Sequence, residues 1–196
     1  MRDLVAEEGR TYAEQAGITL RDEPASLFQL LVLTTLASTR IAADVAAAAA
    51  HELFAAGWRT PQRLLDSTSR QRVDALGRGG YRRYDERTAT VLAESATLLL
   101  EEHGGDLRRL RPSTADEVPE LVTRLQDFPR VGPTGARIFC REVQAVWPAV
   151  RPFFDDRALA TAGRLGLPED AARLGATVAD DDVVRLASAL VRRGTR

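Results

Sequence analysis

A helical hairpin between residues 119 and 145 holds the residues whose order best suits a chemical task. Two segments with one apolar helical face each flank Pro129-Arg-Val-Gly132, and Pro133 follows directly. Proline fits the first turn of a helix, and Gly132 lets the backbone approach an anion closely. Because a helix N-terminus presented in this way binds phosphate, the spacing indicates an anion site. An ordinary helical hairpin without any ligand gives the same pattern.

The composition removes several classes of reaction. All 27 basic residues are arginine, so the chain has no lysine amine. The single cysteine, Cys140, leaves neither a disulfide framework nor a cysteine-rich metal or iron–sulfur site. His51 and His103 are isolated and have no metal-ligand spacing. We therefore expect no cofactor, no iron–sulfur cluster and no bound metal.

The overall charge and hydropathy are those of a soluble globular protein. The net charge of −1, with 44% hydrophobic and 28% charged residues, permits a real core. Arginines can still gather on one face, so the net charge does not decide nucleic-acid binding. The longest apolar runs contain polar residues, and the first eight residues include the acids Asp3, Glu7 and Glu8. We expect neither a membrane span nor a secretory signal, and hence a cytoplasmic protein.

The elements that must position the hairpin are all helical. No period-two alternation of β-branched residues persists long enough for a strand, which predicts an all-α fold. Glycines and prolines divide the pattern into segments. Besides the hairpin, the expected helices run from Leu4 to Ala16, Ser26 to Leu36, Ile41 to Ala55, Pro61 to Leu65, Ser67 to Leu76, Tyr84 to His103, Leu107 to Leu110, Arg157 to Gly163 and Val183 to Arg192.

The hairpin and the loop after it resemble a known family. Phe-Pro-Arg-Val-Gly-Pro-Thr-Gly-Ala at 128–136 is similar to the Leu-Pro-Gly-Val-Gly-Arg-x-Thr-Ala hairpin of the helix-hairpin-helix-Gly/Pro-Asp DNA glycosylases, which include endonuclease III. The proline-rich stretch 147–155 ends in an aspartate, and 155–167 aligns without gaps with the family's Asp-Thr-His-Val-x-Arg-Val-x-x-Arg-Leu-Gly-Leu. Residues 30–54, 84–87 and 100–105 also match, so the resemblance spans about residues 24 to 167.

The resemblance implies two helical lobes of the endonuclease III type. A six-helix lobe is expected at 24–113. The second lobe comprises 1–23 plus 114–196 and carries the helix-hairpin-helix (119–145) and the aspartate loop (147–156). The implied partner is double-stranded DNA that contains a damaged or mismatched base, bound by a monomer.

The resemblance makes Asp155 the candidate catalytic residue. Cleavage of an N-glycosidic bond builds positive charge on the sugar, and a nearby carboxylate stabilises that charge or orients water. Asp156 is the alternative, because a shift of one residue buries Leu159 instead of Ala158. The ungapped match through Leu167 favours Asp155. Either aspartate can also simply cap the helix that follows.

Several positions depart from the family pattern. The first hairpin glycine of the family is Arg130 here, so this residue is expected to have a negative φ or to reshape the turn. Thr134 stands at the position of the catalytic lysine of bifunctional members. Arg40 stands where the family has a glutamine that fills the hole left by the extruded base, and a solvated arginine is its alternative reading. The chain also lacks the family's four-cysteine cluster.

An arginine-rich turn adds to the candidate DNA-binding surface. Arg82, Arg83 and Arg87 lie beside Tyr81 and Tyr84 near a run of glycines, an arrangement suited to phosphate or base contact, although a solvated turn looks the same. The full predicted DNA-binding set is Pro129, Arg130, Val131, Gly132, Thr134, Gly135, Arg40, Arg82, Arg83 and Arg87.

The sequence thus predicts a base-excision repair protein associated with the nucleoid. It is expected to be a DNA glycosylase that hydrolyses the bond to a damaged or mispaired base, monofunctional because it lacks the lyase lysine. One alternative is a catalytically weak or inactive protein of the same fold that binds DNA structure. Another is a helical interaction module. A cleft that joins Asp155, the hairpin and the Arg40 region would favour the enzyme, and an Asp155 buried in an ion pair without a cleft would favour the binding protein.

Overall fold

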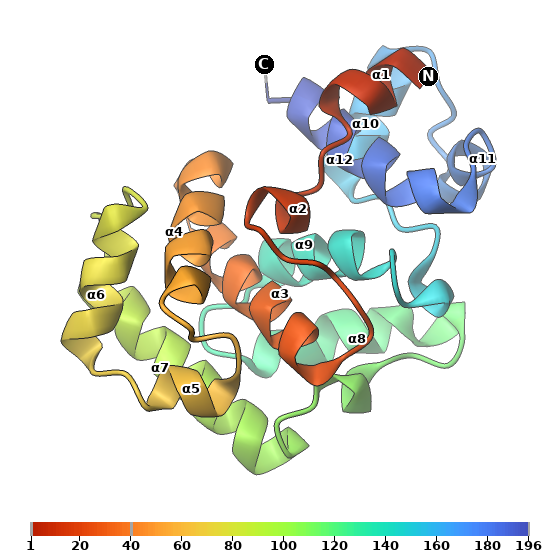
Figure 1. Cartoon of the computed structure of the whole chain (residues 1–196). Coiled ribbons are helices and arrows are strands. Elements are labelled where there is room, and N and C mark those ends of the chain that lie inside the picture. The colour runs from red at the N-terminus through yellow and green to blue at the C-terminus, as the bar shows by residue number, and fades with distance from the viewer. Residues whose placement is uncertain (1, 40, 196) are drawn as a thin grey trace.

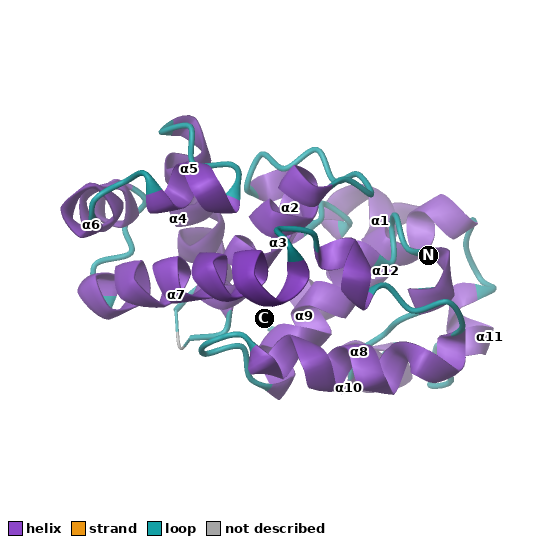
Figure 2. Ribbon diagram, turned by 90° about the horizontal axis from the view of Figure 1, so that it is seen from below, coloured by secondary structure: helices purple, strands orange, loops and turns teal. Residues whose placement is uncertain are grey.

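The chain folds into helices joined by loops, as the sequence predicts. The computed structural model describes residues 2–39 and 41–195, and no strand occurs among them. Figure 2 shows the helices arranged from one end of the molecule to the other, with α4–α7 at one end and α1, α11 and α12 at the opposite end. Within the same residues, no helix combines the length and apolar character that a membrane span needs.

The central helix is α3 (Pro24–Ala37). Its residues from Ser26 to Leu36 are all buried, because apolar or short polar side chains occupy every face. α3 packs against α4 (Ala43–Ala55) and against α9 (Pro133–Val143). Figure 1 shows α3 between these two helices, which connects the first half of the chain to the hairpin.

The end group beyond α4 is formed by α5 (Pro61–Leu65), α6 (Ser69–Arg78) and α7 (Asp85–His103), with α6 packed on both α4 and α7. Thr60 and Thr68 cap α5 and α6 with their side chains. A 3₁₀ turn at Leu107–Leu110 then leads to α8 (Val118–Arg124), the first helix of the hairpin.

The opposite end is formed by the two extremes of the described chain. α12 (Val183–Arg193) packs on α1 (Arg2–Glu8) and on α10 (Asp156–Arg164), and α11 (Ala171–Gly175) lies between α10 and α12 in the sequence. The sequence did not predict α11.

The buried apolar residues form two clusters. One extends from Tyr12 to Val150 and includes the hairpin residues Leu121, Phe128 and Ala136. The other extends from Phe154 to Val191, with Leu4 and Val5 of α1 packed against it. The aspartate loop therefore lies where the chain passes from one cluster to the other, and the division into lobes 24–113 and 1–23 plus 114–196 stays a prediction.

The single helix expected from Leu4 to Ala16 is wrong, because the chain forms α1 and a separate α2 (Tyr12–Gln15). Thr11 and Glu14 make a reciprocal capping box, in which the Thr11 side chain accepts from the Glu14 backbone N–H and the Glu14 carboxylate accepts from the Thr11 N–H. A capping box satisfies amides at the start of a helix, so it begins a new helix here. The new start turns Tyr12 toward the interior of the molecule.

Candidate active site and nucleic-acid interface

The hairpin forms between α8 and α9, and a short 3₁₀ turn (Leu125–Asp127) precedes its loop. Phe128 and Val131 are buried on either side of the loop residues Pro129 and Arg130. The Val131 N–H donates to the Phe128 carbonyl at 3.0 Å and closes the turn. Burial of these two apolar side chains fixes the loop against the core.

Arg130 adopts a left-handed conformation with φ of 62°, which corrects the expectation of a negative φ or a reshaped turn. Arg130 is the third residue of the closed turn between Phe128 and Val131, and an L-residue adopts the left-handed conformation at a cost of about 1–2 kcal/mol. The Arg130 side chain is exposed. The loop thus keeps a backbone suited to glycine and presents a guanidinium group at its tip.

The N-terminus of α9 follows this loop directly. Gly132 is the N-cap in an extended conformation, Pro133 occupies the first turn, and no side chain caps the helix. The first amides of a helix lack intrahelical partners, and an uncapped helix start of this kind can accept an anion. Thr134 is exposed, whereas Gly135 is buried against Ser38 at the end of α3.

Asp155 lies in a pocket of about 560 Å³. Its walls come from α2 through Tyr12, from the α3–α4 turn through Thr39 and Ile41, from the start of α9 through Thr134, and from α12. This volume lies within the range of about 300–1,000 Å³ that is usual for small-ligand pockets. The pocket therefore brings together three of the regions that the sequence singled out.

Both carboxylate oxygens of Asp155 have partners. Oδ1 accepts from the backbone N–H of Ala158 at 2.9 Å, so Asp155 is the N-cap of α10. Oδ2 accepts from Nη1 of Arg141 at 2.8 Å, and the two side chains are 12% and 2% exposed. Asp155 thus lies at a pocket and also in a largely buried ion pair.

Asp156 lines the same pocket but has a different environment. Its side chain is 82% exposed and pairs with Arg137 at 2.8 Å across the rim. Ala158 is fully buried whereas Leu159 is only partly so, which is the burial pattern that the Asp155 register requires. The structure places Asp155 deeper than Asp156, and the catalytic assignment of either residue stays a prediction.

Arg40, the residue expected to fill the gap left by an extruded base, lies outside the described residues. Its neighbours Thr39 and Ile41 both line the pocket. The Thr39 Oγ1 atom lies 2.9 Å from the hydroxyl of Tyr81, which links the α3–α4 turn to the loop before α7. Through this contact, Tyr81 of the arginine-rich turn is joined to Thr39 of the pocket wall.

The arginine-rich turn itself does not line the pocket. Arg82, Arg83 and Arg87 are exposed, and the Arg83 guanidinium lies 5.0 Å from the centre of the Tyr84 ring. Tyr84 is 44% exposed and has a φ of 69°. The turn therefore presents an aromatic ring and several cations to solvent.

Sequence reasoning missed the residue that contacts Asp155 most directly, Arg141. An arginine beside a glutamate in a helix looks like a solvated pair, and no spacing rule signals that Arg141 is buried. Tyr12 was missed because the continuous helix predicted at residues 4–16 gave it no special place.

The cysteine and the histidine near the hairpin show no arrangement that suits catalysis. Burial raises the pKa of the Cys140 thiol to about 12, so it is no thiolate nucleophile near neutral pH. The histidine ring of His103 stacks on Phe128, and burial lowers its pKa. Across residues 2–39 and 41–195, no group of three His, Cys, Asp or Glu side chains is arranged to hold a metal ion.

The fold resembles that of endonuclease III. A solved structure described as a trapped endonuclease III–DNA covalent intermediate, in an estranged-adenine complex, matches this chain with a TM-score of 0.50 and 17% sequence identity. The match covers 97% of this chain and 82% of the other. No protein-family model and no curated protein sequence matches the chain. At this identity the likeness establishes an all-α, endonuclease III-like fold.

Proposed function

We propose that this protein is a DNA glycosylase that removes a damaged or mispaired base by hydrolysis. The observation that carries the proposal is the position of Asp155 in a pocket whose rim includes Thr134 of the hairpin and both neighbours of Arg40. The endonuclease III-like fold supports the same conclusion. A carboxylate near a phosphate-binding helix end suits attack on a nucleotide whose backbone is held at that end.

The proposed reaction begins with a base turned out of the duplex into the pocket. The bond between the base nitrogen and the sugar C1′ breaks, and the base leaves with the electron pair and takes up a proton. The negative charge of Asp155 stabilises the positive charge that develops on the sugar. Water then adds to C1′ and loses a proton, which leaves an abasic site.

We propose that the product strand stays intact. Lyase activity in the resembled family requires an imine between a lysine amine and the opened sugar. Thr134 lies at the pocket rim in the lysine position, and its hydroxyl cannot form an imine. The arginine guanidinium groups remain protonated and are not nucleophilic. The hydrolysis needs no metal or other cofactor, which suits a chain with a single cysteine.

The proposed substrate is double-stranded DNA, contacted by a monomer at the nucleoid. The uncapped start of α9, the exposed Arg130 and the exposed Arg82, Arg83 and Arg87 supply amides and cations for phosphate contacts. α9 packs against α3, as Figure 1 shows, so the hairpin end of the candidate interface rests on the central helix.

One observation favours the second candidate, a DNA-binding protein with little or no catalytic activity. The ion pair with Arg141 offsets the charge of Asp155, which weakens its stabilisation of a cationic sugar. The pocket beside the pair favours the enzyme, since a purely structural ion pair does not require one.

A panel of duplexes tests the proposal. Each duplex carries one oxidised, deaminated, alkylated or mismatched base, and released base is measured by chromatography with Asp155→Asn as the negative control. Release from at least one duplex, lost in the variant, supports a glycosylase. Tight binding to several duplexes without any release would establish the second candidate instead.

A further inference from the structure

Among the described residues, Asp155 is the hydrogen-bond partner of the buried arginine of α9. Arg141 is 2% exposed, and its Nη1 atom donates to Asp155 Oδ2 at 2.8 Å. Its Nε atom lies 3.6 Å from Oε1 of Glu142, which is an ion contact but too long for a hydrogen bond. The guanidinium group also lies 5.0 Å from the centre of the Tyr12 ring. The hydrogen bond that orients the Arg141 guanidinium group is therefore the one to Asp155.

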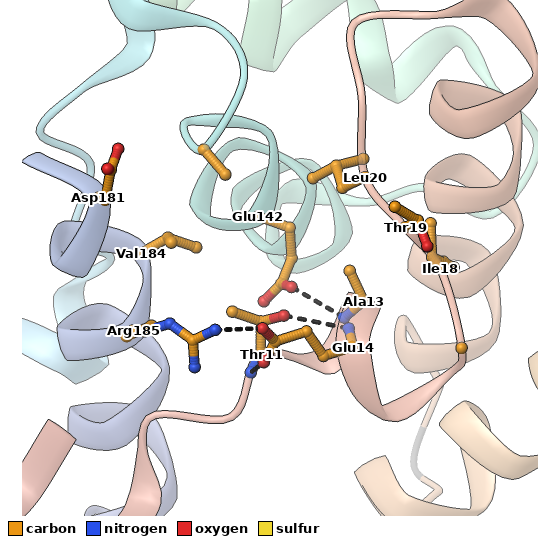
Figure 3. Close-up of a pocket in the computed structure, with 12 residues that line it drawn as sticks. Thr11, Ala13, Glu14, Ile18, Thr19, Leu20, Glu142, Asp181, Val184 and Arg185 are labelled. Atoms are coloured by element: carbon orange, nitrogen blue, oxygen red, sulfur yellow. Dashed lines mark hydrogen bonds and ion pairs between the residues drawn. The ribbon is translucent and has the colours of Figure 1, made fainter. Parts of the chain in front are cut away.

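Glu142 makes the ion contact to this arginine and is itself fixed by the N-terminal segment. Its side chain is fully buried, and Oε2 accepts from the backbone N–H of Ala13 at 3.0 Å. Figure 3 shows Glu142 pointing from α9 toward the start of α2, with a dashed line to Ala13, in a pocket that does not include Asp155. Burial raises the pKa of Glu142, and the nearby Arg141 opposes that shift. The N-terminal segment thus anchors the carboxyl group that faces Arg141.

The C-cap residue of α9, Gln144, holds the loop that carries Asp155. Gln144 is fully buried, its side-chain Nε2 donates to the Phe153 carbonyl at 2.9 Å, and its Oε1 accepts from the Phe153 N–H at 2.8 Å. Gln144 follows Arg141 by three residues, a spacing that places two side chains on one helical face. One fixes the loop backbone and the other fixes the carboxylate.

We propose that Arg141 and Gln144, here named the α9 brace, are positioning residues that hold the Asp155 carboxylate at the pocket. This inference rests on the proposed function and assigns the two residues no contact with DNA. The brace connects Asp155 to the helix that begins at the phosphate-binding hairpin. The carboxylate and the loop backbone are thereby tied to α9 through one ion pair and two hydrogen bonds.

The first test replaces Arg141 by Met, which keeps much of the volume and removes the charge. The rate of single-turnover base release at saturating DNA should fall about a hundredfold. A displacement of the catalytic group by about 1 Å can lower a rate by that factor. DNA affinity should change less than about threefold. Arg141→Lys should recover part of the rate, since it restores the charge without the planar fork. Gln144→Met should lower the rate with no change in affinity.

Arg72→Met is the matched control. Arg72 is also buried, in α6, but it donates to the carbonyls of Ser67 and Ala89, away from the pocket. Its replacement should lower stability and leave the base-release rate of the folded protein unchanged. Equal rate losses in the Arg72 and Arg141 variants, or an Arg141 effect on affinity alone, would overturn the brace.

A double variant tests whether Arg141 acts through Asp155. If it does, Arg141→Met should cost little further rate in an Asp155→Asn background. The double variant should also be more stable than Arg141→Met, because the largely buried Asp155 charge that has lost its arginine is removed. Independent, multiplied losses would show that Arg141 does not act through Asp155.

Carboxyl-carbon NMR separates failure of the brace from failure of the proposed function. The Asp155 signal, assigned by its loss in Asp155→Asn, should shift in Arg141→Met and stay in place in Arg72→Met. If wild-type protein releases no base, the glycosylase proposal fails while this signal still decides whether Arg141 holds the carboxylate. An unmoved signal in Arg141→Met overturns the brace even if the enzyme is active.

Discussion

The contact between α3 and α9 at Gly135 supports a quantitative prediction for Gly135→Ala. A Cβ atom at this position would lie 2.1 Å from Ser38 Oγ and 3.3 Å from Ser38 Cβ. Ser38 Oγ donates to the Thr34 carbonyl at 2.7 Å, so it cannot turn away without loss of that hydrogen bond. The substitution therefore forces either backbone movement or an unpaired hydroxyl.

The magnitude follows from three terms. Overpacking costs about 1–3 kcal/mol, and the lost hydrogen bond costs about 1 kcal/mol where the hydroxyl turns away instead. Alanine is favoured over glycine in a helix by about 1 kcal/mol. The difference between these terms predicts that Gly135→Ala lowers the free energy of unfolding by up to about 2 kcal/mol. In a Ser38→Ala background the shortest overlap is absent, so the same change should be nearly neutral.

Urea unfolding of the four proteins in this cycle measures the coupling between the two sites, which should be up to about 2 kcal/mol. Gly77→Ala is the control, because Gly77 lies in α6 and an added Cβ there meets no atom within 4 Å. That variant should gain up to about 1 kcal/mol from helix propensity alone. The steric argument is refuted if Gly135→Ala stabilises the protein like the control, or if Ser38→Ala leaves its cost unchanged.

Four further predictions concern the site and the hairpin. Binding to duplex DNA, measured by fluorescence anisotropy, should weaken by roughly tenfold per phosphate contact over a tenfold rise in salt, and a constant affinity would contradict the interface. Asp155→Asn should reduce base release at least about a hundredfold and lower stability by up to about 3–5 kcal/mol, because it takes the hydrogen-bonded carboxylate from the buried Arg141 and leaves it the longer ion contact to Glu142; inactivation by Asp156→Asn alone would move the register by one residue. Borohydride should trap no covalent protein–DNA complex and the strand should break only after alkali, whereas trapping that persists with the N-terminal amine blocked would reject the monofunctional mechanism. Arg130→Gly should raise the free energy of unfolding by about 1 kcal/mol through relief of the left-handed residue while DNA binding weakens, and a lower unfolding midpoint would show that the turn carries no such strain.

Hydrophobic periodicity was sufficient to predict most of the helices, but it missed α11 and several boundaries. The pattern from Ser26 to Leu36 is apolar on all faces, and the structure places this segment at the centre as α3. The division between α1 and α2 was missed, because it depends on the Thr11 capping box more than on any gap in apolar spacing. A local hydrogen bond of this kind leaves no mark on periodicity.

The parts of the site that belong to a sequence motif could be predicted, whereas the parts that depend on tertiary packing could not. Asp155 and the hairpin follow from linear spacing, and the structure brings both to one pocket. The left-handed Arg130 was not expected, because burial of its two apolar neighbours decides its φ and outweighs local preference. Arg141 became visible only through its partners, which come from separate segments of the chain.

The order in which these segments leave the ribosome determines when the pocket can form. α1, with seven residues, is too short to be a stable helix alone, and its partner α12 comes near the opposite end of the described chain. α10 depends on α12 as well, and Val191 of α12 lines the pocket. The large cluster from Tyr12 to Val150 can therefore collapse during synthesis while Asp155 still lacks its surroundings. A nascent chain arrested before α12 would hold the hairpin and the central helix, yet have no completed pocket in which Asp155 could act.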